Sequence, residues 1–140
     1  MNDSAAPTAK TINAGVERLC KDFTAMLLPM GFRRTTSKSK FWRRANGNIV
    51  EQIHMQRSGS GRAPINSTVS VEVCFSTHPA SAQPPFALNG PCSSKLKNSA
   101  GYHYHLRFNA LTWSTYDRCI ADLERVLLEH GLPWFSRPGA

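Results

Sequence analysis

The chain has 140 residues, 41% hydrophobic and 19% charged, a composition typical of one folded domain and not of a disordered chain. No apolar run approaches the roughly 18 residues of a membrane span, and the opening MNDSAAPTAK lacks the apolar segment of a signal peptide. We therefore expect a cytoplasmic protein that does not enter a membrane. Its four cysteines show no CxxC or other tight spacing, so we expect four unpaired thiols.

The formal net charge of +8 is concentrated in residues 31–62. In this segment eight cations stand against Glu51 alone, whereas the other 108 residues carry nine cations and eight acids. A local basic field of this kind attracts anionic partners. The eight cations are Arg33, Arg34, Lys38, Lys40, Arg43, Arg44, Arg57 and Arg62.

The first periodic segment is helical. Residues 1–8 show no apolar period, so we expect a disordered N-terminus ahead of a single domain over 9–136. Hydrophobic side chains at spacings of three and four then predict an amphipathic helix over about 9–28. Pro29 and Gly31 end it, because the residue before proline avoids the α region and glycine accepts a left-handed C-cap.

The next segments have a period of two, which predicts strands. Between two of them Asn46-Gly47 indicates a type I′ turn, so residues 32–58 are expected to form a basic β-hairpin. The clearest alternation places Val69, Val71 and Val73 on one side of a half-buried strand. The expected strands cover residues 32–36, 40–45, 48–58, 66–77 and 102–108.

The rest of the chain is a long loop and a last helix. Residues 78–101 hold four prolines and four serines without a period, which predicts a functional or mobile loop. Ser114, with Asp117 three residues later, predicts a capped helix that ends at Gly131 and Pro133. Trp134 and Phe135 are expected to fold back as an apolar latch before a short tail at 137–140.

Together these elements predict an α+β fold. We expect an antiparallel sheet of four to five strands with the N- and C-terminal helices packed on one face, a two-layer sandwich. The other face of the sheet would then be polar. Strand residues two apart share a face, so this face would collect Gln52, His54, Gln56, Ser70, Glu72, Cys74, His103, His105 and Arg107.

Three histidines and Glu72 are a set of zinc ligands if the strands meet in the right register. The alternative is a plain polar face that serves as a partner surface, and on this basis we predict neither a metal nor a cofactor. Catalytic motifs are also missing from the sequence: there is no GxSxG, and no glycine-rich phosphate loop with its lysine. We assign no catalytic residue, and a hydrolase or metal-dependent enzyme is the third functional alternative.

The stretch KFWRRANGN puts Lys40, Trp42 and Arg44 on one face of its strand and Phe41 and Arg43 on the other. If Phe41 joins the core, Trp42 lies outward, where it can stack on a base while the cations hold phosphates. The same residues also fit a charged sheet edge, or a tryptophan covered by arginine. The predicted partner- or anion-binding residues are Arg33, Arg34, Lys40, Trp42, Arg43, Arg44 and Arg57.

Several stretches resemble the uncharacterised bacterial domain-of-unknown-function family 4304 over about residues 19–135: LLPMGFRR, KFWRRANGNIVEQIHMQRS, TVSVEVCF, YHLRF and LLEHGLPWF. Two segments depart from the family pattern. An Asn-Leu-Gly stretch is replaced by Val71-Glu72-Val73, and a tryptophan-rich segment is reduced to Trp113. The matching positions are Gly31, Phe32, Phe41, Arg43, Gln56, Ser58, His105 and Arg107.

This resemblance implies a fold and no activity. It singles out Gln56, Ser58, His105 and Arg107 as candidates for a ligand or partner site. For Gln56 and Ser58 the alternative is that they satisfy loop backbone groups at the strand end.

The sequence therefore predicts a non-enzymatic binding or regulatory module that engages a protein or other anionic partner through the hairpin and the polar face. Nucleic-acid binding through the hairpin is the second alternative. The oligomeric state stays open, although an exposed edge near residues 32–45 would allow strand pairing between two copies.

Overall fold

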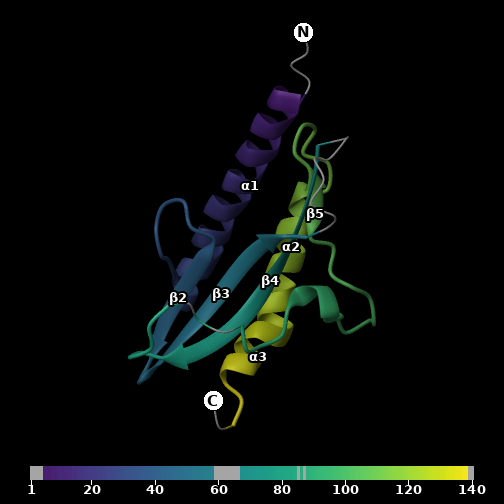
Figure 1. Cartoon of the computed structure of the whole chain (residues 1–140). Helices are drawn as coiled ribbons and strands as arrows, with labels where there is room; N and C mark the ends of the chain where they lie inside the picture. The colour runs from purple at the N-terminus through teal and green to yellow at the C-terminus, as the bar shows by residue number, and fades with distance from the viewer. Residues whose placement is uncertain (1–4, 59–66, 85, 87, 139–140) are drawn as a thin grey trace.

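A computed structural model describes residues 5–58, 67–84, 86 and 88–138 and shows an α+β fold (Figure 1). Five strands form one curled antiparallel sheet in the order β1-β2-β3-β4-β5, and helices α1 and α2 contact each other and the sheet. Among the described residues, none of the helices combines the length and apolarity needed to span a bilayer. The elements are α1 (Ala5–Leu27), β1 (Arg33–Arg34), β2 (Phe41–Asn46), β3 (Ile49–Arg57), β4 (Thr68–Pro79), β5 (Arg107–Asn109), α2 (Tyr116–Val126) and α3 (Leu132–Phe135), with single turns at Leu28–Met30, Ser93–Lys95 and Leu127–Gly131.

Helix α1 begins earlier than predicted, at Ala5 instead of near residue 9. Ala5 and Ala6 are strong helix formers, and Pro7 is tolerated in a first turn, where its missing N–H has no helical partner to lose. The end of the helical segment agrees with the sequence. Gly31 has φ +91° and donates its N–H to the Leu28 carbonyl, as a left-handed C-cap requires.

The turn of the hairpin lies one residue later than predicted. Asn46 pairs with Ile49, so the two turn residues are Gly47 and Asn48. Of these, Gly47 has the positive φ, +62°, whereas Asn46 and Asn48 lie outside the left-handed region. A two-residue turn with glycine in the first position is the pattern of type II′, not of type I′.

The hydrophobic core combines side chains of α1, α2 and α3 with side chains of the strands. Trp42, Ile53 and Phe75 are paired across β2, β3 and β4, and all three are fully buried. Phe23 of α1 packs edge-on against Trp42 at 4.9 Å between ring centroids, and Phe135 does the same against Phe75 at 5.8 Å. Phe135 is thus a core residue, but it lies in α3 on a helical continuation of α2, so the predicted fold-back of the chain is wrong.

Strand β4 is long, and β5 covers little of its outer edge. β5 pairs with Thr68, Val69 and Ser70, and beyond them the 78–101 loop and the segment before β5 take over. The bonds are Val71 N–H to the Leu106 carbonyl, Val73 N–H to Ser93 Oγ, Phe75 N–H to the Pro91 carbonyl, and Thr77 to the side chain of Asn89 through both backbone groups. The loop therefore satisfies an edge that would otherwise be open to another strand.

A disulfide joins this loop to the sheet, which corrects the expectation of four free thiols. Cys74 of β4 and Cys92 of the loop are 18 residues apart, and an isolated antiparallel bridge places them side by side. No spacing rule in the sequence reveals a pairing that depends on where a long loop returns. Cys20 and Cys119 are free and buried, as predicted.

The last strand is shorter than its sequence pattern, and the last helical segment is longer. Of the strand predicted over 102–108, the sheet includes Arg107 and Phe108. Helical backbone continues from α2 through Leu127–Gly131 into α3, so the predicted end at Gly131 and Pro133 is wrong: Gly131 has right-handed helical angles, and Pro133 lies in the first turn of α3, where a proline is tolerated.

Helix α2 begins at Tyr116 behind Thr115, which has φ +64° and makes no side-chain cap, so the predicted Ser114 cap is wrong. Thr115 instead donates its hydroxyl to the Arg107 carbonyl and ties the start of the helix to β5.

Replacing Trp42 by alanine tests whether this side chain is part of the core. We expect the free energy of unfolding to fall by about 3–5 kcal/mol, the usual cost of truncating a buried aromatic residue. Urea denaturation measures it, with Tyr102→Ala, at a site 71% exposed, as the control expected to change stability by less than about 0.5 kcal/mol. Equal small effects of the two substitutions would contradict the burial of Trp42.

Opening the Cys74–Cys92 disulfide is expected to lower the free energy of unfolding by about 3 kcal/mol, because the bond restricts the unfolded chain across a separation of 18 residues. Urea denaturation of the oxidised chain and of the Cys74→Ser/Cys92→Ser variant measures the difference. Reducing agent should destabilise the wild type and leave the variant unchanged. A wild type that is insensitive to reduction would mean that the two thiols are not paired.

Candidate functional site

The sheet face opposite the core carries the polar side chains that the alternation predicts. The register pairs Gln52 with Ser76, His54 with Cys74, and Gln56 with Glu72, so these six side chains share one face. At the two ends of the same face lie Arg33, paired with Arg43, and Arg107, paired with Ser70. Cys74, which forms the disulfide with Cys92, is fully buried. The other side chains of this face are polar and lie outside the hydrophobic core.

Part of this polar face is occupied by its own hydrogen bonds. Gln52 is 1% exposed, accepts a bond of 2.8 Å from Arg43 Nε and donates one of 3.3 Å to Ser76 Oγ. Gln56 donates its amide to the Glu72 carboxylate, not to loop backbone as the alternative predicted. Gln52 is therefore a structural residue, whereas the side chains of Gln56 and Glu72 remain partly exposed.

His54 is half-buried on the same face. Its ring stacks on Phe41, with centroids 4.3 Å apart and planes 5° from parallel. Nδ1 is buried without a hydrogen-bond partner among the described residues. Burial lowers the pKa of His54 below its ordinary value, so the ring is neutral near pH 7.

The predicted outward position of Trp42 is wrong. The side chain is fully buried, and its indole N–H donates to Thr24 Oγ1 of α1 at 2.9 Å. Arg34 lies over the ring at 5.8 Å, as the arginine-covered alternative proposed. Since the Trp42 face joins the core, the outward face of β2 is the one with Phe41 and Arg43, and Trp42 is not available to stack on a base.

Arg34 shares the face of Trp42 and is neutralised internally. Its side chain is 9% exposed and makes two hydrogen bonds to the carboxylate of Glu17, at 3.1 and 3.2 Å. These bonds hold the pKa of Glu17 below its usual value. Arg34 also donates Nε to the Ser39 carbonyl at 2.6 Å, so its role is structural and its predicted role in anion binding is not supported by this geometry.

Arg44 is also neutralised by a carboxylate inside the protein. It contacts one oxygen of Glu51 at 2.6 Å, donates to the Met30 carbonyl at 2.8 Å and lies over Phe32 at 4.4 Å. Glu51 is 2% exposed, so Arg44 balances a buried charge. The predicted anion-binding role of Arg44 is therefore replaced by a structural one.

Fewer cations of the hairpin than predicted are without a carboxylate partner. Arg33 and Arg43 face each other across β1 and β2, and within the described residues neither makes an ion pair. Arg43 packs over Phe86 of the loop at 5.1 Å. Arg57 is exposed but pairs with Val71, which places it on the core side of the sheet at the strand end, and Lys40 is half-buried beyond the start of β2.

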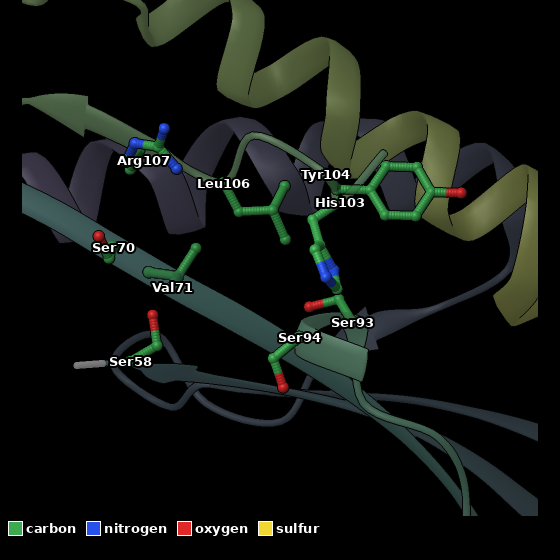
Figure 2. A pocket seen from close by; sticks show the side chains of 9 residues that line it. All are labelled: Ser58, Ser70, Val71, Ser93, Ser94, His103, Tyr104, Leu106 and Arg107. Atoms are coloured by element: carbon green, nitrogen blue, oxygen red, sulfur yellow. The ribbon is translucent and has the colours of Figure 1, made fainter. Parts of the chain in front are cut away.

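A cleft of about 180 Å³ opens where β4, β5 and the loop meet (Figure 2). Ser58 and Ser70 reach it because the Ser58 N–H donates to the Ser70 carbonyl at 2.9 Å. Arg107 is exposed at the same end and has no ion pair among the described residues. The full lining is Ser58, Ser70, Val71, Ser93, Ser94, His103, Tyr104, Leu106 and Arg107. The cleft thus combines four serine hydroxyl groups with one arginine and one histidine, over the apolar side chains of Val71 and Leu106.

The sequence missed Ser93 and Ser94 because they belong to a loop without a period. His103 and His105 do not join His54 in a zinc site. His103 donates Nδ1–H to the Leu96 carbonyl, and the backbone N–H of His105 donates to Asp122 of α2. Among the described residues the candidate metal group is a different one, Glu72, Cys74 and Cys92.

No family model matches the sequence, and neither a curated protein nor a solved structure matches it. The resemblance to family 4304 therefore stays a hypothesis.

His105 predicts how stability depends on pH. Burial lowers the pKa of His105 below its ordinary value of 6.5; Arg107 and Arg118 lower it further, and Asp122 raises it. As the pH falls, the unfolded chain therefore binds a proton at His105 before the folded chain does. This contribution is present above about pH 6.5 and is lost as the pH falls toward the lower pKa of the folded state. His105→Gln should therefore lose less stability than the wild type between about pH 7.5 and pH 5.5.

Urea denaturation at the two pH values measures this, with Leu111→Ala, at a site 68% exposed that carries no titratable group, as the control that keeps the pH dependence of the wild type. Parallel losses in wild type and His105→Gln would show that His105 does not contribute.

Proposed function

We propose that the protein is a non-catalytic binding module and that it docks an acidic segment of a partner protein on the helix-free face of a two-layer sandwich. One observation carries this proposal. On that face Arg33, Arg43 and Arg107 have no carboxylate partner among the described residues, and Glu72 is the acid that the register places with them.

The contrast with the other arginines supports this interpretation. Arg34 and Arg44 lie on the core side of the same strands, and each is matched by a carboxylate. Unmatched cations on an open face raise the local concentration of anions and increase association rates. The serine hydroxyl groups that line the same cleft as Arg107 add neutral donors for a carboxylate bound there.

The burial of Trp42 favours an acidic protein over a nucleic acid as the partner. Binding of a single strand depends on aromatic side chains on which bases stack, and the hairpin keeps Trp42 in the core. Arg43 and Arg33 retain the ability to attract phosphates, so nucleic-acid binding is the second candidate and an enzyme the third. Membership in the bacterial family 4304 and a location in the cytoplasm belong to the same proposal.

Removing the paired cations tests the proposal. We expect a fluorescent decaglutamate peptide to bind the wild type at low salt, and Arg33→Ser/Arg43→Ser to weaken it roughly 10-fold, since each exposed pair contributes up to about 1 kcal/mol. Arg107→Ser should weaken it by a smaller factor. The matched control is Lys10→Ser/Lys21→Ser, which removes the same charge from exposed positions of α1 and should leave the affinity nearly unchanged.

The same titrations with an oligothymidylate distinguish the second candidate. Tighter binding of the oligonucleotide, lost in Arg33→Ser/Arg43→Ser, would favour nucleic acid. Equal loss of peptide binding in the β-sheet variant and in the α1 control would mean that only the net charge matters, and would contradict a defined site.

A further inference from the structure

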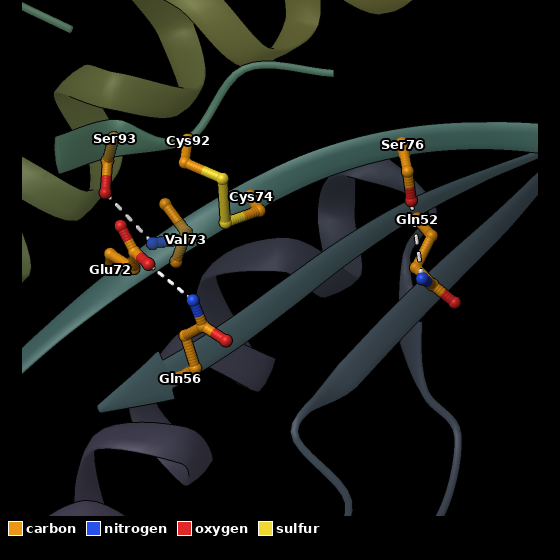
Figure 3. The surroundings of a disulfide bond; sticks show 8 residues. All are labelled: Gln52, Gln56, Glu72, Val73, Cys74, Ser76, Cys92 and Ser93. Carbon is orange, nitrogen blue, oxygen red and sulfur yellow. Dashed lines mark hydrogen bonds between the residues drawn. A yellow bond between two sulfur atoms is a disulfide. The ribbon is translucent and has the colours of Figure 1, made fainter. Parts of the chain in front are cut away.

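Three side chains with metal-binding atoms converge on the helix-free face where β4 meets the loop (Figure 3). Glu72 and Cys74 are two residues apart on β4 and share its face, and the antiparallel bridge brings Cys92 beside Cys74. The two sulfur atoms and a carboxylate oxygen lie within 4.8 Å of one another. Among the described residues, this is the group of histidine, cysteine and acid side chains that comes this close.

We propose that in the reduced protein Cys74, Cys92 and Glu72 form a binding site for Zn²⁺, with a water molecule as the fourth ligand. Zinc binds thiolate sulfur at about 2.3 Å and carboxylate oxygen at about 2.0–2.2 Å, in a tetrahedron. Such a tetrahedron separates its ligand atoms by roughly 3.5–3.8 Å, a spacing that lies inside the observed limit of 4.8 Å.

The backbone keeps the two cysteines together without the sulfur–sulfur bond. On either side of Cys92, the Pro91 carbonyl accepts from Phe75 N–H at 3.0 Å and Ser93 Oγ accepts from Val73 N–H at 2.9 Å. These bonds flank Cys74 on β4 in the same way. Reduction therefore leaves a preorganised pair of thiols, which is what a metal site needs.

The third ligand is held by a neighbour. Gln56 lies opposite Glu72 in the register and donates its amide to the carboxylate. A hydrogen bond of this kind fixes the orientation of a metal ligand. Cys74 is fully buried, whereas Cys92 and Glu72 are half-buried, so a cation can enter from the loop side.

The chemistry of the two states balances. A water-soluble phosphine reduces the bond: disulfide, phosphine and water give two thiols and one phosphine oxide. Binding of Zn²⁺ then releases the two thiol protons as the sulfurs become thiolates. Oxidised protein has no thiolate at this place, so the disulfide and the metal exclude each other. In a reducing compartment the dithiol form dominates.

The test uses the full chain with Cys20→Ala/Cys119→Ala, which leaves Cys74 and Cys92 as its only thiols. After reduction with phosphine and anaerobic desalting, Co²⁺ is added as a spectroscopic probe and then displaced by Zn²⁺. We expect one Co²⁺ per chain, with thiolate-to-cobalt charge-transfer absorption and the visible bands of a tetrahedral ion. The same chain left oxidised should show neither.

Variants of the ligands sharpen the result. Cys92→Ser should weaken Zn²⁺ binding by more than about 100-fold, and Gln56→Ala, which removes the neighbour and not a ligand, by roughly 10-fold. Glu72→Gln retains the shape of the side chain and should weaken binding without unfolding the domain, as checked by circular dichroism. His103→Gln, at an exposed histidine outside the group, is the matched control.

Absence of the thiolate band in the reduced chain, or unchanged Zn²⁺ affinity in Glu72→Gln, would overturn the site. Neither result depends on whether an acidic partner docks on the sheet.

Discussion

The burial of Trp42 against α1 is the constraint on which the rest of the structure depends. Side chains of a strand alternate between two faces, so placing one of them in the core fixes the orientation of all the others. Trp42 pairs with Ile53, and Ile53 with Phe75, and this row meets Phe23 and Phe135 from the helices. The faces of three strands follow from it.

This orientation brings arginines to the core side, and the fold must neutralise them. A charge removed from water is tolerated when it is paired and hydrogen-bonded. Glu17 reaches Arg34 from α1, and Glu51 reaches Arg44 from the next strand. The basic segment is therefore divided into cations that hold the sheet to the helices and cations, Arg33 and Arg43, that face solvent on the other side.

The long loop gives the helix-free face its chemistry. Because β5 is short, the loop satisfies the outer edge of β4, and in doing so it brings Cys92 to Cys74 and places Ser93 and Ser94 in the lining of the cleft. An edge that would otherwise invite aggregation becomes the border of a cleft and of a cluster of metal-binding atoms. The cleft and the cluster of metal-binding atoms thus share one structural cause, although they use different side chains.

The sequence by itself determined the elements and much of their order: the helix that ends at Gly31, the alternation that places Val69, Val71 and Val73 in the core, and the burial of Phe135. These features follow from the spacing of hydrophobic residues and from local backbone preferences, and both can be read from residues that are close in sequence. Only the tertiary structure decided which face of β2 is buried, that Cys74 meets Cys92, and that His105 lies against Asp122 of α2 rather than beside His54. Each of these depends on a contact between distant segments, and no local period carries information about which segments meet.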